Sequence, residues 1–112
     1  YTAVAEFHYL HHDPAGAPYG DLAEMSERVI AAAEATGIGL TMLPVLYGAG
    51  GFGGKPATEG QRRFLNDPQR FLELIGILRG RHGADHGRRK PVGKARLLHQ
   101  ILGLCHVLFI AE

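Results

Sequence analysis

The stretch YTAVAEFHYLHHD, residues 1–13, decides the expected fold, because a run of packing residues ends there in a cluster of ionisable groups. We expect residues 1–10 to form a strand covered on both faces, as in parallel sheets. Pro14 and Gly16 mark the turn that follows. A strand that carries ionisable groups at its carboxyl end is typical of α/β enzymes. The uncharged packing residues of the run are Tyr1, Ala3, Val4, Ala5, Phe7 and Leu10.

A helix and a second strand are expected next. Asp21 is the expected start of the helix, because its side chain can accept backbone N–H groups and Glu24 stands in capping-box position. Apolar residues recur at helical spacing up to Gly37, which ends the helix because glycine readily adopts positive φ. Residues 38–46 are nearly all apolar and form the expected second strand. Strand, helix and strand within about fifty residues predict a parallel pair joined by a crossover helix.

The rest of the chain is expected to add two helices and a third strand. Residues 67–78 have helical spacing of apolar residues, and Pro68 suits the first helical position. Residues 79–96 are rich in arginine, lysine and glycine and lack apolar periodicity. A short third helix is expected at residues 95–102, and a third strand at residues 104–112. The chain is therefore predicted to be one α/β unit.

Composition limits the class of protein. The 112 residues are 46% hydrophobic, which is ordinary for a globular chain. Twelve basic against eleven acidic residues give a net charge of +1, so no overall attraction to nucleic acid or anionic membranes is expected. The single cysteine, Cys105, cannot form an internal disulfide and favours a reducing compartment. Because the chain begins inside an apolar run, we expect it to be a segment of a longer protein.

The cluster after the first strand is the main candidate site. A substrate- or metal-binding rim is one interpretation of His8, Tyr9, His11, His12 and Asp13. A metal needs three or four converging donors, and His8 points away from Tyr9 in extended chain, so a metal site made wholly of these residues is disfavoured. We favour a solvated loop with imidazoles bonded to the backbone for His11 and His12. Tyr9 is the stronger candidate, because a phenol at a strand end can bind a carboxylate or an amide.

Three further features have a functional interpretation and a plainer one. The glycine-rich loop of residues 48–54 could cradle a phosphate, but no Gly-Lys-Ser/Thr follows, so we favour a mobile active-site loop. The basic residues 88–96 could contact phosphates, but no aromatic residues interleave them, so we favour a solvated loop. Glu112 follows an apolar run, at a strand end where general acids and bases often lie.

Four segments, in order along the chain, resemble one known family. The similarity is to the formimidoylglutamate deiminases of the metal-dependent amidohydrolase superfamily, and it covers about residues 1–78. It implies an α/β fold that is part of a (β/α)8 TIM barrel, with parallel strands and crossover helices. Residues 1–112 would form a single incomplete barrel segment, with residues 79–112 divergent. The matching segments are YTAVAEFHYLHHD (1–13), GIGLTMLPVLY (37–47), GFGG (51–54) and GQRRF (60–64).

The resemblance also implies a reaction. The family hydrolyses N-formimino-L-glutamate to N-formyl-L-glutamate and ammonia in histidine degradation, with water activated by zinc or another divalent metal. Tyr9 matches a substrate-contacting tyrosine, His106 stands in for a substrate-binding histidine, and Glu112 matches the proton shuttle. Phe109 occupies the place of a metal-ligating histidine, and the other ligands have no counterpart. No residue of this chain is therefore expected to bind the metal.

From this resemblance we expect the parent protein to be a cytoplasmic, homo-oligomeric deiminase that acts on the C–N bond of a small linear amidine. No nucleic-acid or membrane partner is expected. The isolated chain is expected to be inactive, because the metal ligands are missing. Two alternatives stay open: another deaminase of the same superfamily that acts on a ring amidine, and a non-catalytic α/β module that binds an anionic partner through residues 88–96.

Overall fold

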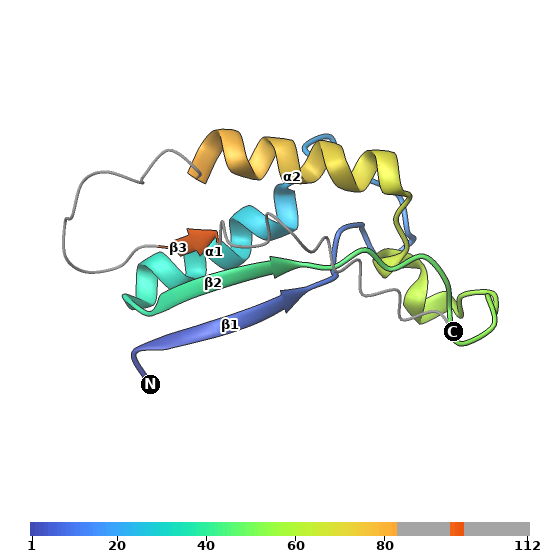
Figure 1. The fold of residues 1–112 in the computed structure, drawn as a ribbon, viewed down its shortest axis with the longest axis horizontal. Helices are drawn as coiled ribbons and strands as arrows, with labels where there is room; N and C mark the ends of the chain where they lie inside the picture. The colour runs from blue at the N-terminus through green and yellow to red at the C-terminus, as the bar shows by residue number, and fades with distance from the viewer. Residues whose placement is uncertain (83–94, 98–112) are drawn as a thin grey trace.

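The computed structural model describes residues 1–82 and the backbone of residues 95–97. Three strands form a sheet in the order β1-β2-β3, and both neighbouring pairs are parallel (Figure 1). The predicted α/β class with parallel strands is therefore confirmed. The elements in chain order are β1 (Ala3–His8), α1 (Glu24–Thr36), β2 (Gly39–Pro44), the 3-10 helix η1 (Glu59–Phe64), α2 (Pro68–His82) and β3 (Ala95–Leu97).

β1 and β2 pair over their full length and end together. Ala3 lies opposite Gly39 at one end, and His8 lies opposite Pro44 at the other. Proline lacks the N–H that the ladder needs, so its place at the last position of β2 is the one expected from the sequence. Because the strands are parallel and in register, the residues that follow each of them emerge at the same edge of the sheet.

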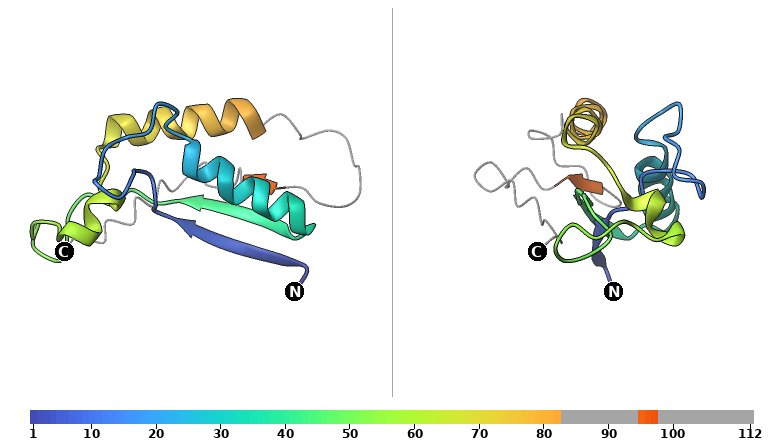
Figure 2. Two further views of the ribbon diagram at one scale, coloured as in Figure 1. Left: turned by 180° about the vertical axis from the view of Figure 1, so that it is seen from behind. Right: turned by 90° about the vertical axis from the view of Figure 1, so that its right-hand side faces the viewer.

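The core lies between the two helices and β2. Leu40 and Met42 are alternate residues of β2, so both side chains point to the same face. β1 lies at the edge of the sheet that is farthest from α2 (Figure 2). The buried apolar residues are Ala23, Ile30, Ala33, Leu40, Met42, Leu46, Phe71, Leu74 and Leu78.

The predicted burial of the first strand on both faces is wrong for the described part of the chain. Val4 and Phe7 of β1 are exposed, as are the alanines of this strand, and only His8 is fully buried. The cause is that β1 lies at the edge of the described sheet, where its contacts are mainly with β2 and no described helix covers most of its length. Its apolar sequence therefore exceeds what the described residues cover.

The start of the first helix differs from the prediction. α1 begins at Glu24 rather than at Asp21, and the Asp21 carboxylate accepts the Ala23 N–H at 2.9 Å in the turn before it. Glu24 does not close a capping box, because its carboxylate pairs with Arg28 at 2.7 Å, one helical turn further on. The end is as predicted: Gly37 adopts φ 73°, and the Ile38 N–H returns to the Ala33 carbonyl.

The second helix is longer than predicted, and the prediction of a third helix is wrong for its first residues. α2 extends to His82, one turn beyond the expected end at residue 78. Residues 95–97, expected to begin a helix, form β3 instead and pair with residues 40–42. The second edge of β2 offers unpaired backbone groups, and pairing with them outweighs local helix propensity. The remainder of that helix and the strand expected at residues 104–112 lie outside the described residues.

The length and apolar character of α1 and α2 decide whether either helix could cross a membrane. Of the helices in the described part of the chain, none has both the length and the apolar character that a bilayer crossing requires.

The packing of α2 predicts a large difference between two leucines. Leu74 is 1% exposed and lies in the core, whereas Leu72 is 61% exposed. Leu74→Ala should lower the free energy of unfolding by about 2–5 kcal/mol, because it removes buried methyl groups and leaves a cavity. Leu72→Ala is the matched control and should change it by less than about 0.5 kcal/mol. Urea unfolding followed by circular dichroism measures both, and equal effects would contradict the packing described.

Candidate functional site

The candidate site lies at the edge of the sheet where β1 and β2 end. Three segments meet there: the residues after β1, the residues after β2, and η1. The Val45 N–H donates to the His8 carbonyl at 2.9 Å. The N–H groups of His11 and His12 both donate to the Arg63 carbonyl, at 3.2 and 3.1 Å. Backbone hydrogen bonds thus join segments that are about fifty residues apart in the sequence.

Three aromatic rings form a cluster at this edge, made of Tyr9, Tyr47 and Phe64. Tyr9 stands edge-on to Phe64, with ring centroids 4.9 Å apart and an interplanar angle of 86°. Tyr47 meets the same ring at 5.9 Å and 73°. Such edge-to-face contacts are favourable because ring edges are positive and ring faces negative. Tyr9 remains 43% exposed, so its phenol can reach a ligand.

The aromatic cluster borders a shallow hollow of about 470 Å³. Tyr9 and Phe64 line it, together with the charged side chains of Glu6 and Arg63. The Arg63 guanidinium also donates to the His12 carbonyl at 3.4 Å, which fixes its position beside the end of β1. The hollow therefore combines an apolar wall with one acidic and one basic group.

Gln61 connects the aromatic cluster to the glycine-rich loop. Its side-chain amide donates to the Tyr47 hydroxyl at 3.4 Å and to the Gly50 carbonyl at 3.1 Å. Its carbonyl oxygen accepts from the Thr58 N–H at 2.9 Å, which forms a capping box at the start of η1. This role of Gln61 was not predicted from the sequence. The signal was present in the spacing Thr58-x-x-Gln61, which is a capping-box pattern.

The glycine-rich loop after β2 is tied to its surroundings at Gly50. The Gly50 N–H donates to the Lys55 carbonyl at 2.8 Å, and Gly50 packs directly against the backbone of Pro56 and Ala57. Within residues 48–54 only Gly53 and Gly54 adopt positive φ, at 73° and 70°. Gly50 is thus needed for a close backbone approach, and the last two glycines for the turn.

Three histidines are buried beneath this edge. His8 and His11 meet edge-to-face at 5.3 Å, and the His11 ring bonds the Val45 carbonyl at 2.9 Å. The predicted backbone bond of His11 is therefore found, but the predicted solvation of His11 and His12 is wrong, since each is 3% exposed. The reason is α2, whose Phe71 ring packs 6.1 Å from His11.

Burial determines the charge state of these histidines. Burial, and next the neighbouring His11, lower the pKa of His8 from 6.5 to about 4. Burial likewise lowers the pKa of His11, and burial together with Arg70 lowers that of His12. Because burial disfavours the imidazolium, we infer that these rings are neutral at pH 7. In residues 1–82 no hydrogen-bond partner is found for Nε2 of His8, Nδ1 of His11 or either ring nitrogen of His12.

Of the residues predicted for the site, the structure places Tyr9 at the carboxyl edge of the sheet. His106 and Glu112 lie outside the described residues, as do most of the basic residues 88–96. Within residues 1–82, no three His, Cys, Asp or Glu side chains converge in a way that could hold a metal ion. The described part of the chain therefore does not fit a metal by itself.

Comparison with known proteins identifies relatives of most of the chain. It is 63% identical over 79 residues to formimidoylglutamate deiminase of Pseudomonas aeruginosa. Its structure matches the crystal structure of an amidohydrolase from Brucella melitensis with a TM-score of 0.61 at 57% identity. The chain resembles a piece of an amidohydrolase. The resemblance to the formimidoylglutamate deiminases that was read from residues 1–78 is thus confirmed for a partial chain.

The extent of these matches limits what they mean. Each covers 70% of this chain, but the chain spans only 17% of the curated deiminase and 18% of the solved structure. No family model matches the chain. One relative is named a formimidoylglutamate deiminase and the other an amidohydrolase, and the chain corresponds to less than a fifth of either.

The buried histidines predict a loss of stability in acid. Between pH 6.5 and 4 the unfolded chain binds a proton at His8 that the folded chain does not, so the free energy of unfolding falls as the pH falls through this range. With about 1.4 kcal/mol for each pKa unit, His8 alone contributes about 3 kcal/mol of loss. Urea unfolding at pH 7 and at pH 4 measures the difference. His8→Leu should reduce it, and an unchanged difference in this variant would contradict burial of a neutral His8.

Two neighbouring glycines provide a test of the loop. A Cβ atom at Gly50 would collide with the Pro56 carbonyl and Ala57 Cα, which are backbone atoms and cannot rotate away. Gly50→Ala should therefore lower the free energy of unfolding by about 1–3 kcal/mol. Gly51→Ala is the control, because its Cβ would meet only the Lys55 side chain at 3.8 Å. Urea unfolding compares the two, and equal stability would show that the loop is not held at Gly50.

Proposed function

We propose that the chain is a segment of a metal-dependent amidohydrolase that converts N-formimino-L-glutamate to N-formyl-L-glutamate and ammonia. The observation that carries the proposal is the 63% identity to a formimidoylglutamate deiminase over 79 residues. The placement of Tyr9 at the carboxyl edge of two parallel strands supports it, because α/β enzymes build their sites at that edge. The isolated chain, as a single incomplete domain, is proposed to be inactive.

The proposed complete fold is a (β/α)8 TIM barrel, of which this chain supplies consecutive parallel strands and helices. Two features support this. β1 has an apolar sequence that the described residues leave exposed, and an adjacent strand of a closed barrel would cover its edge. The matched relatives are far longer than the chain, so the covering strands would come from the remainder of the parent.

Tyr9 is proposed to bind the substrate. Its hydroxyl can donate a hydrogen bond to a substrate carboxylate, and bonds to charged groups are worth about 1.5–3 kcal/mol. The hollow beside it also contains Arg63, whose charge favours an acidic substrate. Tyr9 thus binds and orients the substrate and takes no part in proton transfer.

Other roles are proposed for residues outside the described part of the chain. His106 is proposed to contact the substrate, and Glu112 to shuttle protons. A divalent metal, with zinc as the first candidate, would be held by the remainder of the parent, since no group of three possible ligands converges within residues 1–82. The parent is further proposed to be cytoplasmic and homo-oligomeric, with a small-molecule substrate and no nucleic-acid or membrane partner.

A chimeric enzyme tests the proposal. The matching part of the Pseudomonas deiminase is replaced by residues 1–78 of this chain, and ammonia release from N-formimino-L-glutamate is measured. The chimera should be active, and Tyr9→Phe should lower its kcat/KM about tenfold to a hundredfold, as loss of a bond to a charged group predicts. Tyr1→Phe is the matched control, because Tyr1 is fully exposed at the other end of β1.

Two outcomes would refute the proposal. One is a folded chimera that releases no ammonia from the formimino substrate. The other is a chimera that hydrolyses a ring amidine such as guanine faster than the formimino compound, which would favour a different deaminase of the superfamily. The 112-residue chain assayed alone should release no ammonia with added zinc, and measurable turnover would contradict its proposed incompleteness.

A further inference from the structure

Tyr9 lies just beyond the ladder that orders β1. The last residue of β1 is His8, so strand pairing does not set the direction of the next side chain. In residues 1–82 the Tyr47 hydroxyl accepts a hydrogen bond from Gln61, whereas no such bond is found for the Tyr9 hydroxyl. Within these residues the orientation of Tyr9 therefore comes from packing, with the Phe64 ring at 4.9 Å and the Tyr47 ring farther away at 6.5 Å.

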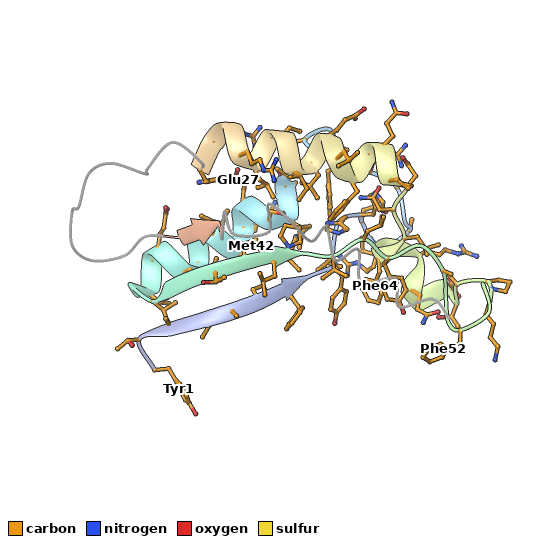
Figure 3. The ribbon with its side chains drawn as sticks, viewed as in Figure 1. Tyr1, Glu27, Met42, Phe52 and Phe64 are labelled. Atoms are coloured by element: carbon orange, nitrogen blue, oxygen red, sulfur yellow. The ribbon has the colours of Figure 1, made fainter. Side chains whose placement is uncertain are left out.

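Phe64 is itself held from two sides. As the last residue of η1, it moves with the Arg63 carbonyl, which accepts the N–H groups of His11 and His12. On its other side it contacts Tyr47, whose hydroxyl accepts from Gln61. Figure 3 shows Phe64 beside the ends of β1 and β2, whereas Phe52 lies far out on the glycine-rich loop.

From this geometry we propose that Phe64 and Gln61 are positioning residues that set the direction of the Tyr9 phenol. Phe64 supplies the ring against which Tyr9 stands. Gln61 holds Tyr47 against Phe64 and at the same time holds the Gly50 carbonyl, so the conformation of the glycine-rich loop is coupled to the orientation of Tyr9. Gln61 does not line the hollow and acts through Tyr47, whereas Phe64 lines the hollow and acts in this proposal by holding Tyr9.

The arrangement also predicts how strongly each residue matters. Edge-to-face pairs contribute about 0.5–1.5 kcal/mol beyond their area, so loss of the Phe64 ring should release Tyr9 directly. Loss of the Gln61 amide removes a neutral hydrogen bond to Tyr47 and no bond to Tyr9 itself, so the effect on Tyr9 should be smaller. The proposal therefore includes a larger effect on Tyr9 from loss of Phe64 than from loss of Gln61.

The first experiment measures Tyr9 in the full 112-residue chain and does not depend on the proposed function. The four tyrosines are replaced by 3-fluorotyrosine, and the Tyr9 signal in the fluorine NMR spectrum is assigned with Tyr9→Phe. Phe64→Leu should move this signal toward that of free fluorotyrosine, and Gln61→Ala should move it less in the same direction. Phe64→Tyr keeps the ring and adds a fifth fluorotyrosine signal, and in this variant the Tyr9 signal should stay closer to its original position than in Phe64→Leu.

Phe52→Leu is the matched control, because Phe52 is exposed and remote from Tyr9. Circular dichroism of each variant verifies that the chain is folded. A Tyr9 signal that stays in place in folded Phe64→Leu would overturn the proposal, as would an equal movement in Phe52→Leu.

The second experiment rests on the proposed function and uses the active chimera. Phe64→Leu should raise KM for the formimino substrate about tenfold and Gln61→Ala should raise it less, with kcat changed much less in both variants. Damage to folding alone would lower the active fraction, and thus kcat, and leave KM unchanged; that result would overturn the positioning role. An inactive parent chimera would instead refute the proposed function, and the fluorine spectra would still decide the positioning role.

Discussion

The in-register parallel pairing of β1 and β2 is the constraint on which the rest of the structure depends. Parallel neighbours cannot be joined by a tight turn, so the chain must cross over, and α1 is that crossover. The same geometry makes both strands end at one edge. Every contact of the candidate site follows from this: Tyr9 can meet Tyr47, and His11 can bond the Val45 carbonyl, only because His8 and Pro44 lie side by side.

At this edge of the sheet, some side chains form a buried layer and others form an exposed layer. His8 and His11 are buried, and His11 packs against Phe71 of α2. Burial lowers the pKa of both imidazoles and so favours their neutral form. Tyr9, which follows the last residue of β1, packs against Phe64 instead and stays accessible. Residues 8–11 thus contribute both to the packing beneath the edge and to the surface above it. η1 supports both layers. Its Arg63 carbonyl accepts the N–H groups of His11 and His12, and its Phe64 ring packs against Tyr9.

The sequence predicted the features that depend on local patterns. The strand and helix order through residue 78, the end of α1 at Gly37 and the position of Pro44 all follow from periodicity, capping and the missing proline N–H. The errors come from tertiary contacts. Burial of His11 and His12 depends on where α2 packs, and the strand at residues 95–97 depends on the free edge of β2. The role of Gln61 could have been found from the Thr58-x-x-Gln61 spacing, but its bond to Tyr47 could not, because that contact requires the folded loop.

The link between α1 and α2 has a consequence for ionic strength. Arg81 near the end of α2 pairs with Asp21 at 2.7 Å and with Glu27 at 3.2 Å, and all three side chains are partly exposed. Such exposed pairs contribute little to stability, and at physiological ionic strength salt screens charges over about 8 Å. Added sodium chloride should therefore weaken the ion pairs of Arg81, whereas the buried contacts at the carboxyl edge of the sheet should persist. The two ends of α2 would then respond differently to salt. Ion pairs hold the end at Arg81, whereas buried packing holds the end at Phe71.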